Sequence, residues 1–392
     1  MTVLTDRSMT PVASMAGSDR LRAAMARDLA GHLALVGPLP ALSNAAALVA
    51  EVRAAGLTGH GGAGFPTWRK LETVAAGRNP VVIANGAEGE PASGKDRALL
   101  EQAPHLVLDG LQVAAAATGA TMAYAYVRAS AQAVLRRALA ERSDRVKVEI
   151  VTAAESFVSG QETAVVAAIE GGRPVPRDVP DLVVRNGVRG RPTLVQNVET
   201  LAQLALLARH GAAWFRQVGT LEQPGTFLAT VSGSVRRPGV HEAAYGVPLA
   251  DLLSQAGGPA EPLQAVLVGG YHGVWLPQEA LSAPMSVEGL APWGGTPGAG
   301  VVVALGRSES GLAATAKIAA YLAGESARQC GPCLNGLPAM ATVLGRMAHG
   351  EKHPDLPRQV EWLTRVVEGR GACHHPDGTA RMVRSALALF NR

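Results

Sequence analysis

The sequence predicts an α/β fold in which a mainly parallel sheet precedes a small β-rich unit and a helical bundle. Between residues 80 and 151, short β-branched segments alternate with helix-forming segments, the pattern of a parallel sheet with crossover helices. Between 227 and 269, short apolar segments broken by glycines predict a compact β-grasp-like unit. Between 337 and 389, three segments with apolar residues at helical spacing predict a bundle.

The individual elements follow from apolar periodicity and from the residues that start and stop helices. Ser43 is the expected N-cap of a helix that runs to Ala55. Residues 193–209 are expected to form a single helix. The remaining expectations are strands over 80–84, 123–127 and 146–151, and helices over 21–35, 104–117, 130–140, 162–169, 311–322, 337–347, 356–367 and 380–389.

Composition limits the classes of protein to which this chain can belong. Of its 392 residues, 47% are hydrophobic and only 4% are aromatic, so the core should consist of alanine, valine and leucine. A chain of this length predicts two or three domains. The net charge is +4 and the sequence has no basic stripe, so we expect no nucleic-acid partner.

Two features of the sequence bear on the cellular compartment. The N-terminal residues lack the apolar segment of a signal peptide. The uncharged run over 110–127 is interrupted by a Thr-Gly pair and divides into a helix and a strand, so it should not cross a membrane. We therefore expect a cytoplasmic protein with no direct membrane insertion.

A glycine-rich segment is the centre of the predicted site. Within nine residues the chain carries Gly56, Gly59, Gly61, Gly62 and Gly64. Such a backbone can adopt positive φ and bring N–H groups close to an anion. The spacing satisfies G-x-G-x-x-G, but the segment follows an expected helix instead of the strand that a dinucleotide fingerprint requires. The pattern favours a nucleotide-phosphate loop of another kind, and a plain surface loop is the alternative.

The order of several motifs resembles one known family. G-x-GGAGFPT is followed by N-x-x-E-x-EP and KDR, then by SGQETA, GRPT, NVET and a cysteine-containing C-terminus, over residues 45–385. This order of motifs resembles that of the NADH-oxidising flavoprotein subunit of respiratory complex I. It is also similar to that of the flavin subunits of soluble NAD-linked hydrogenases and formate dehydrogenases. The resemblance implies FMN in the glycine loop, a hydride accepted from NADH, and single electrons passed to a [4Fe-4S] cluster.

The resemblance also implies roles for individual residues. Glu162, the expected catalytic residue, would lie beside the nicotinamide. The expected flavin contacts are Gly59, Gly61, Gly62, Gly64, Lys70, Asn85, Glu88, Asn197 and Thr200. Turn formation is the alternative role for Asn85 and Glu88, and the first turn of a helix is the alternative for Gln161 and Glu162. Gln161 and Ala87 replace family carboxylates, which should change the charge near the flavin.

The expected NADH clamp is incomplete. In the family, two phenylalanines stack on the adenine beside a lysine, and the matching positions here are Thr73, Leu182 and Val179. Losing two stacking platforms should weaken dinucleotide binding, since each is worth about 1–3 kcal/mol in nucleic-acid sites. NADH is therefore the implied substrate, with another electron donor as the alternative.

Three cysteines define a second expected site. Cys330, Cys333 and Cys373 match three of the four cluster ligands of the family, and Ala327 stands at the position of the first. An odd number of cysteines with a C-x-x-C pair favours metal or redox chemistry over disulfides. The fourth ligand would be absent or supplied by His374 or His375, and a three-iron cluster, a Cys₃His zinc site or inert thiols are alternatives.

These expectations combine into one description of the chain. We expect an N-terminal segment over 1–40, a Rossmann-like FMN-binding domain over 41–212, an SLBB-type β-grasp domain over 224–306, and a helical iron–sulfur domain over 308–392. Electrons would pass from NADH through FMN and the cluster to a ferredoxin-like or thioredoxin-like iron–sulfur partner. The alternatives are a flavin and iron–sulfur protein that does not use NADH, and a docking adaptor with few cofactors.

Overall fold

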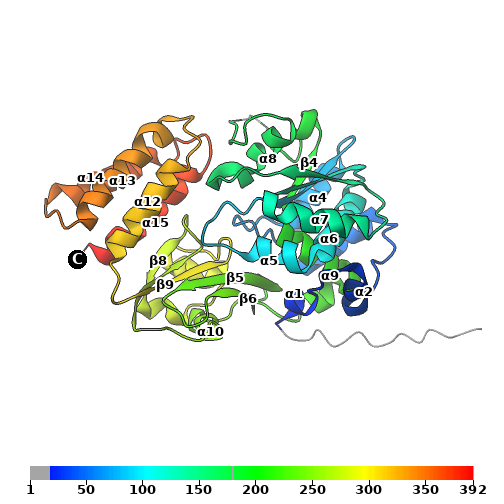
Figure 1. The fold of residues 1–392 in the computed structure, drawn as a ribbon, viewed down its shortest axis with the longest axis horizontal. Helices are drawn as coiled ribbons and strands as arrows, with labels where there is room; N and C mark the ends of the chain where they lie inside the picture. The colour runs from blue at the N-terminus through cyan, green and yellow to red at the C-terminus, as the bar shows by residue number, and fades with distance from the viewer. Residues whose placement is uncertain (1–17, 179–180, 392) are drawn as a thin grey trace, which may run out of the picture.

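The first of two sheets is parallel throughout. The computed structural model describes residues 18–178 and 181–391, which form the two sheets and a C-terminal group of helices (Figure 1). The strand order is β3-β2-β1-β4. This is one half of a Rossmann-type sheet, so the α/β prediction is confirmed. The strands are β1 (Val81–Gly86), β2 (Met122–Val127), β3 (Val148–Thr152) and β4 (Thr193–Asn197).

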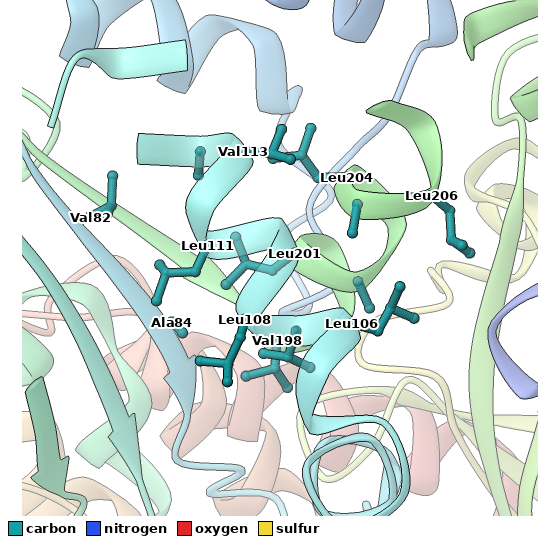
Figure 2. Packing of buried hydrophobic residues seen from close by; sticks show 14 of the residues in the cluster. Val82, Ala84, Leu106, Leu108, Leu111, Val113, Val198, Leu201, Leu204 and Leu206 are labelled. Carbon is teal, nitrogen blue, oxygen red and sulfur yellow. The ribbon is translucent and has the colours of Figure 1, made fainter. Parts of the chain in front are cut away.

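The main core lies between this sheet and two long helices, α6 (Pro104–Thr118) and α9 (Val198–Phe215). Figure 2 shows Leu108 of α6 and Leu201 of α9 in one apolar layer with Val82 and Ala84 of β1. Alternate residues of β1 belong to a smaller cluster on the other face. A Cβ on Gly110 would lie 1.9 Å from the carbonyl oxygen of Leu201, so only glycine lets α6 approach α9 this closely.

The other helices of this half surround the sheet or precede it. Helix α6 is buried along nearly its whole length, because the sheet, α9 and these helices cover it on every side. Their bounds are α1 (Arg20–Ala23), α2 (Leu29–Val36), α3 (Ala45–Ala55), α4 (Thr67–Ala75), α5 (Lys95–Gln102), α7 (Ala129–Ala140) and α8 (Glu162–Ile169). Over the described residues, no helix has both the length and the apolar character needed to cross a membrane.

The second sheet is mixed and has its own core. Its strand order is β6-β5-β9-β7-β8, with β5 and β9 parallel and the other pairs antiparallel. Phe227, Leu253 and Val266 lie in that core. The expected β-grasp unit is confirmed. The elements are β5 (Thr226–Gly233), β6 (Gly239–Ala244), α10 (Leu249–Gln255), β7 (Leu263–Val268), β8 (Val274–Pro277), α11 (Val287–Leu290) and β9 (Val301–Gly306).

The C-terminal helices form the expected bundle at one end of the molecule (Figure 1). They are α12 (Gly311–Gly324), α13 (Leu337–Ala348), α14 (Asp355–Val367) and α15 (His375–Phe390). The last helix also contacts the second sheet, because the hydroxyl of Ser385 accepts a hydrogen bond from the Trp275 amide at 2.9 Å. The bundle therefore packs on the β-grasp unit as well as on itself.

Two of the expected elements are wrong. The helix expected over 21–35 is two helices, because Asp28 interrupts it and caps α2 by accepting from the Gly31 amide at 2.8 Å. The helix expected over 193–209 begins with a strand, since residues 193–197 pair with β1 as β4. Its helical part starts at Val198 and continues through a kink at Gly211. The N-cap of α3 is Asn44 instead of Ser43, one residue from the expected position.

A half-buried glutamate joins the first half of the molecule to the second sheet. The Glu90 carboxylate, in the loop after β1, accepts hydrogen bonds from the amides of Tyr271 at 2.8 Å and Ala92 at 3.1 Å. Gly270 has φ +85°, and a Cβ there would lie 2.6 Å from Glu90 Oε2. Burial raises the pKa of Glu90 to about 7. This contact between the two halves therefore takes up a proton near neutral pH.

We predict that Glu90→Gln alters the pH dependence of folding stability. The folded protein holds the Glu90 proton up to about pH 7, whereas the unfolded chain releases it near the ordinary value of 4.5. Between these values the folded state binds more protons, so the wild type loses stability as pH rises. Unfolding free energy measured at pH 5 and pH 8 should fall more in the wild type than in the variant, by at most about 3 kcal/mol.

The control for this measurement is Glu149→Gln. Glu149 is exposed on β3, so its replacement should leave the pH profile unchanged. Identical profiles for the wild type and Glu90→Gln would contradict a proton bound by Glu90 in the folded state.

Candidate functional site

The glycine loop, residues 59–64, closes a turn between α3 and α4. Its ends are fixed by a hydrogen bond from the Gly59 amide to the Phe65 carbonyl at 2.9 Å. Gly62 and Gly64 have φ of 112° and 61°, the left-handed region that favours glycine. A Cβ on Gly64 would meet no atom within 4 Å. The loop therefore presents open backbone on which a ligand can lie.

A buried ionic network of Lys95, Asp96 and Glu199 lies next to the glycine loop. Lys95 Nζ lies 2.6 Å from Asp96 Oδ1, 3.0 Å from Glu199 Oε2 and 2.9 Å from Asn197 Oδ1. Burial by itself would lower the pKa of Lys95, but the two carboxylates raise it above its usual range. Burial raises the pKa of Asp96 to about 6 although Lys95 opposes this shift. The KDR and NVET motifs contain Lys95, Asp96 and Glu199 but assign them no role, and only the fold brings the three side chains together.

Asn197 and Thr200 connect this network to the loop. The amide of Asn197 donates from Nδ2 to Asp96 Oδ2 at 2.7 Å, and its Oδ1 caps α9 by accepting from the Glu199 amide. The hydroxyl oxygen of Thr200 accepts from the His60 amide at 2.9 Å. A Cβ on Gly61 would lie 3.6 Å from the Asn197 Cβ. The structure thus brings both residues to the glycine loop.

Asn85 and Glu88 have structural partners in the loop after β1. Asn85 Nδ2 donates to the Gly160 carbonyl at 2.8 Å, which ties this loop to the segment before α8. Glu88 Oε1 accepts from the Asp96 amide at 2.9 Å, and Oε2 accepts from the Arg97 amide at 3.1 Å. Glu88 therefore caps α5. Their flavin contacts stay predictions, and the alternative of turn and loop chemistry describes the contacts that are present.

Lys70 and Glu162 form an ion pair beside the glycine loop. They come from α4 and from the first turn of α8, and their side chains are 17% and 38% exposed. The Phe65 ring is 45% exposed, and its centroid lies 6.0 Å from Lys70 Nζ. Gln161 caps α8, because its Oε1 accepts from the Thr163 and Ala164 amides. A cation, an anion and an aromatic face thus stand together where solvent reaches them.

The expected dinucleotide-clamp positions carry no ring. The hydroxyl of Thr73 donates to the Arg69 carbonyl at 2.8 Å on the surface of α4. Leu182 is 67% exposed. Val179 lies outside the described residues. Neither described side chain can stack on a base as an aromatic ring does.

The cysteines lie at two helix ends of the C-terminal bundle. Cys330 and Cys333 occupy the turn that precedes α13, and Cys373 precedes α15. Burial and the neighbouring thiols raise the pKa of Cys333 to about 12, and burial raises that of Cys373. Among the described residues, no three His, Cys, Asp or Glu side chains converge in an arrangement that could hold a metal ion. The thiols are thus neighbours that do not point to one centre.

The two histidines expected as alternative ligands have other positions. The His374 side chain is fully exposed, and its Nδ1 lies 3.1 Å from Asp377 Oδ2. The His375 ring is buried, with Nδ1 3.1 Å from His272 Nε2 and Nε2 2.8 Å from the Leu322 carbonyl. The structure therefore does not bring either ring to the thiols.

Three family models match the chain. They are the Nuo51 FMN-binding domain over residues 52–206, the SLBB domain over 228–270, and the NADH-ubiquinone oxidoreductase-F iron-sulfur binding region over 313–392. The F 2 subunit of NADH-quinone oxidoreductase from Rhizobium meliloti (strain 1021) is 35% identical, with 88% of this chain and 86% of that protein covered. The chain belongs to the family of NADH-quinone oxidoreductase F subunits. The resemblance is confirmed, as are its FMN and 4Fe-4S cofactors.

Other relatives agree with this family. The F subunit of NADH-quinone oxidoreductase from Escherichia coli (strain K12) is 31% identical, with 88% of this chain and 82% of that protein covered. The structure of an NAD+-reducing [NiFe]-hydrogenase in the H2-reduced state matches with a TM-score of 0.83 and 32% identity over 90% of this chain. This chain spans 62% of that hydrogenase chain. The chain is thus an FMN and iron–sulfur electron-transfer protein of this family.

The residues around the glycine loop fit FMN on structural grounds. Two side-chain atoms in segments that adjoin the site, Thr67 Oγ1 of α4 and Gln196 Nε2 of β4, are buried and have no hydrogen-bond partner among the described residues. Thr67 begins the helix after the loop, and Gln196 precedes Asn197. Buried polar atoms are normally paired, so orphans beside an open glycine loop indicate a polar ligand. Phosphate, ribityl and ring atoms of FMN supply such partners.

We predict that Gly62→Val abolishes flavin retention. The side chain would occupy the open backbone of the loop and force a β-branched residue to φ 112°. The matched control is Gly119→Val, which also places valine at positive φ but at the end of α6, away from the loop. Flavin absorbance after gel filtration should be lost only in Gly62→Val. Stoichiometric flavin in that variant would contradict binding in this loop.

Proposed function

We propose that this protein takes a hydride from a reduced dinucleotide beside Lys70 and Glu162 and delivers single electrons from the cysteine site to a small iron–sulfur protein in the cytoplasm. The ion pair at the mouth of the glycine loop carries this proposal. FMN in the loop would supply the conversion of a two-electron hydride into single electrons. The chain would bind and orient both reactants and set the local charge.

The charges of the chain bear directly on that role. Lys70 and Glu162 neutralise one another, so the pair adds little net charge beside the loop. Gln161 is neutral, and its amide oxygen is occupied by capping α8. Charge near a flavin tunes its reduction potential. We therefore infer that Glu162, and not its neutral neighbour Gln161, provides the carboxylate that contacts the bound electron donor.

The donor site supports NADH binding only weakly. Phe65 offers one exposed aromatic face, whereas Thr73 and Leu182 offer none. Binding of the adenine, which lies far from the reacting atoms, should therefore be poor. The proposed hydride site depends instead on the Lys70–Glu162 ion pair. A donor other than NADH is the second candidate, and these missing rings are the observation that favours it.

We predict a KM for NADH above the usual range of about 1 μM to 1 mM. Thr73→Phe with Leu182→Phe should lower KM by roughly 5- to 100-fold and change kcat less, since stacking on the adenine stabilises ground and transition states alike. Stopped-flow reduction of the flavin at graded NADH measures both. Leu221→Phe is the control, because Leu221 is 77% exposed and lies in the loop before β5. Rapid reduction of the wild type at micromolar NADH would contradict a weak donor site.

The surface around the cysteines supports an acidic partner. Arg328 and Arg370 are exposed and lie close in sequence to Cys330 and Cys373. Gln329 donates to the Pro176 carbonyl at 2.9 Å, which brings the loop containing exposed Arg173 to the same place. In the described part of the chain, none of these three arginines pairs with a carboxylate.

An exposed apolar residue completes this surface. Leu334 directly follows Cys333 and is 53% exposed. Unpaired cations around an apolar centre are complementary to an acidic protein with a small apolar contact. The relatives are named as subunits of larger enzymes, which agrees with a protein partner. We propose that the occupant is a small acidic iron–sulfur protein of the ferredoxin-like or thioredoxin-like kind.

We predict that Arg328→Glu with Arg370→Glu weakens electron transfer to an acidic [2Fe-2S] ferredoxin. The KM for ferredoxin should rise by roughly tenfold at low salt, and the difference should shrink at about 1 M salt, where charges are screened beyond about 3 Å. Arg145→Glu is the control, since Arg145 is exposed just before the amino-terminal end of β3. Equal KM values for all three proteins would contradict docking at the cysteines.

A further inference from the structure

The amino-terminal half of β5 has an edge that no strand covers in the described part of the chain. On one side β5 pairs with β6 from Thr226 to Val231, but on its other side the pairing with β9 begins only at Thr230. The backbone groups of Thr226 and Leu228 that face the β9 side therefore need other partners, because unpaired backbone groups at a buried position cost stability.

Side chains from the α/β half occupy this edge. The Leu228 amide donates to Glu199 Oε1 at 2.7 Å, and Gln203 Nε2 donates to the Thr226 carbonyl at 3.0 Å. The His60 ring approaches the same carbonyl, with Nε2 3.3 Å from the oxygen. Since a carbonyl only accepts, Nε2 of His60 carries the proton in this contact. Side chains of the first half thus take the place that a strand would occupy.

His60 is the one of these three side chains that belongs to the glycine loop. Its backbone amide donates to the Thr200 hydroxyl, and its ring is buried, with 4% of the residue exposed. The ring also lies against Tyr245, which follows β6, with 5.9 Å between the ring centroids. Burial lowers the pKa of His60 although nearby Glu199 raises it, so the ring is neutral at neutral pH. One residue therefore connects the loop to the β-grasp unit through two contacts.

The β-grasp unit also approaches the loop farther along the chain. A Cβ on Gly62 would lie 4.0 Å from the amide nitrogen of Ala299, in the segment just before β9. Glycine-rich segments lose much conformational freedom when they become ordered, so an anchor at one end lowers the cost of binding a ligand. We infer that the β-grasp unit sets the position of the glycine loop, and that His60 is the positioning residue through which it does so. The inference rests on the proposed placement of FMN in the loop only where flavin binding is measured.

The test compares His60→Leu with His60→Gln in the flavin-free full-length protein. Leucine fills much of the space of the ring but cannot donate to Thr226, whereas the glutamine amide can donate from Nε2. The Kd for FMN, measured by flavin fluorescence titration, should rise by roughly 2- to 12-fold in His60→Leu, the equivalent of one net hydrogen bond, and stay near the wild-type value in His60→Gln. Before any flavin is added, the backbone amides of residues 61–64 should exchange with deuterium faster in His60→Leu than in the wild type.

Two other variants separate positioning from a general loss of stability. His105→Leu removes another buried histidine of the same half, on α6, where its Nε2 lies 3.1 Å from Glu141 Oε2. It should lower the unfolding temperature but leave the Kd for FMN and the exchange of residues 61–64 unchanged. Tyr245→Leu changes only the β-grasp side of the contact. It should raise both quantities, and its effect should add less than fully to that of His60→Leu, since the two rings lie against one another.

The inference is overturned if His60→Leu retains the wild-type Kd and exchange rates. It is equally overturned if His60→Gln is impaired as much as His60→Leu, or if His105→Leu matches it. If His60→Leu does not fold, Tyr245→Leu decides the question by the same two measurements. Failure of the proposed function has a different appearance: FMN would bind to none of these proteins, while exchange in the flavin-free protein would still support or overturn the role of His60.

Discussion

One buried lysine holds together the segments around the glycine loop. Lys95 begins α5 and contacts Asp96 beside it, while Glu199 and Asn197 come from the junction of β4 and α9. His60 of the glycine loop lies 3.9 Å from the same Glu199. Removing one partner from a buried charged pair costs about 3–5 kcal/mol, because the other charge is left without compensation. The network therefore connects the loop, the helix and the strand end to one another.

Two separate groups of charged residues flank the glycine loop, the Lys95 network and the Lys70–Glu162 pair. The side chains of the network pair with one another, so they do not cover the outer face of the glycine loop. Two other buried atoms, Thr67 Oγ1 and Gln196 Nε2, have no hydrogen-bond partner among the described residues. The Lys70–Glu162 ion pair joins two other helices, α4 and α8, beside the loop. Buried ion pairs under an open polar face would let a ligand bind there with little reorganisation.

The sequence predicted the parts of this structure that depend on local pattern. Helices such as α6, α8 and α14 have apolar residues at helical spacing and lie close to their expected bounds. Strand β4 was missed because its five residues run directly into α9 with no glycine or proline between them, so only pairing with β1 reveals the change. The motifs predicted separate roles for Lys70, as a flavin contact, and for Glu162, as the catalytic residue. Their pairing across 92 positions is a property of the tertiary fold and has no local signal.

Three of the departures from the family motif lie at exposed or half-buried positions, whereas Ala87 is fully buried. Leu182 is exposed, and Thr73 and Ala327 are half-buried, so replacing a ring or a thiol at these positions leaves no buried charge unpaired. By contrast, Lys95, Asp96 and Glu199 are buried together, and removing Lys95 would leave two buried carboxylates without a cation. Burial therefore constrains the Lys95 network more strongly than it constrains Thr73, Leu182 or Ala327. Because a substitution at an exposed position usually changes folding stability little, substitutions should accumulate at such positions before they reach the Lys95 network.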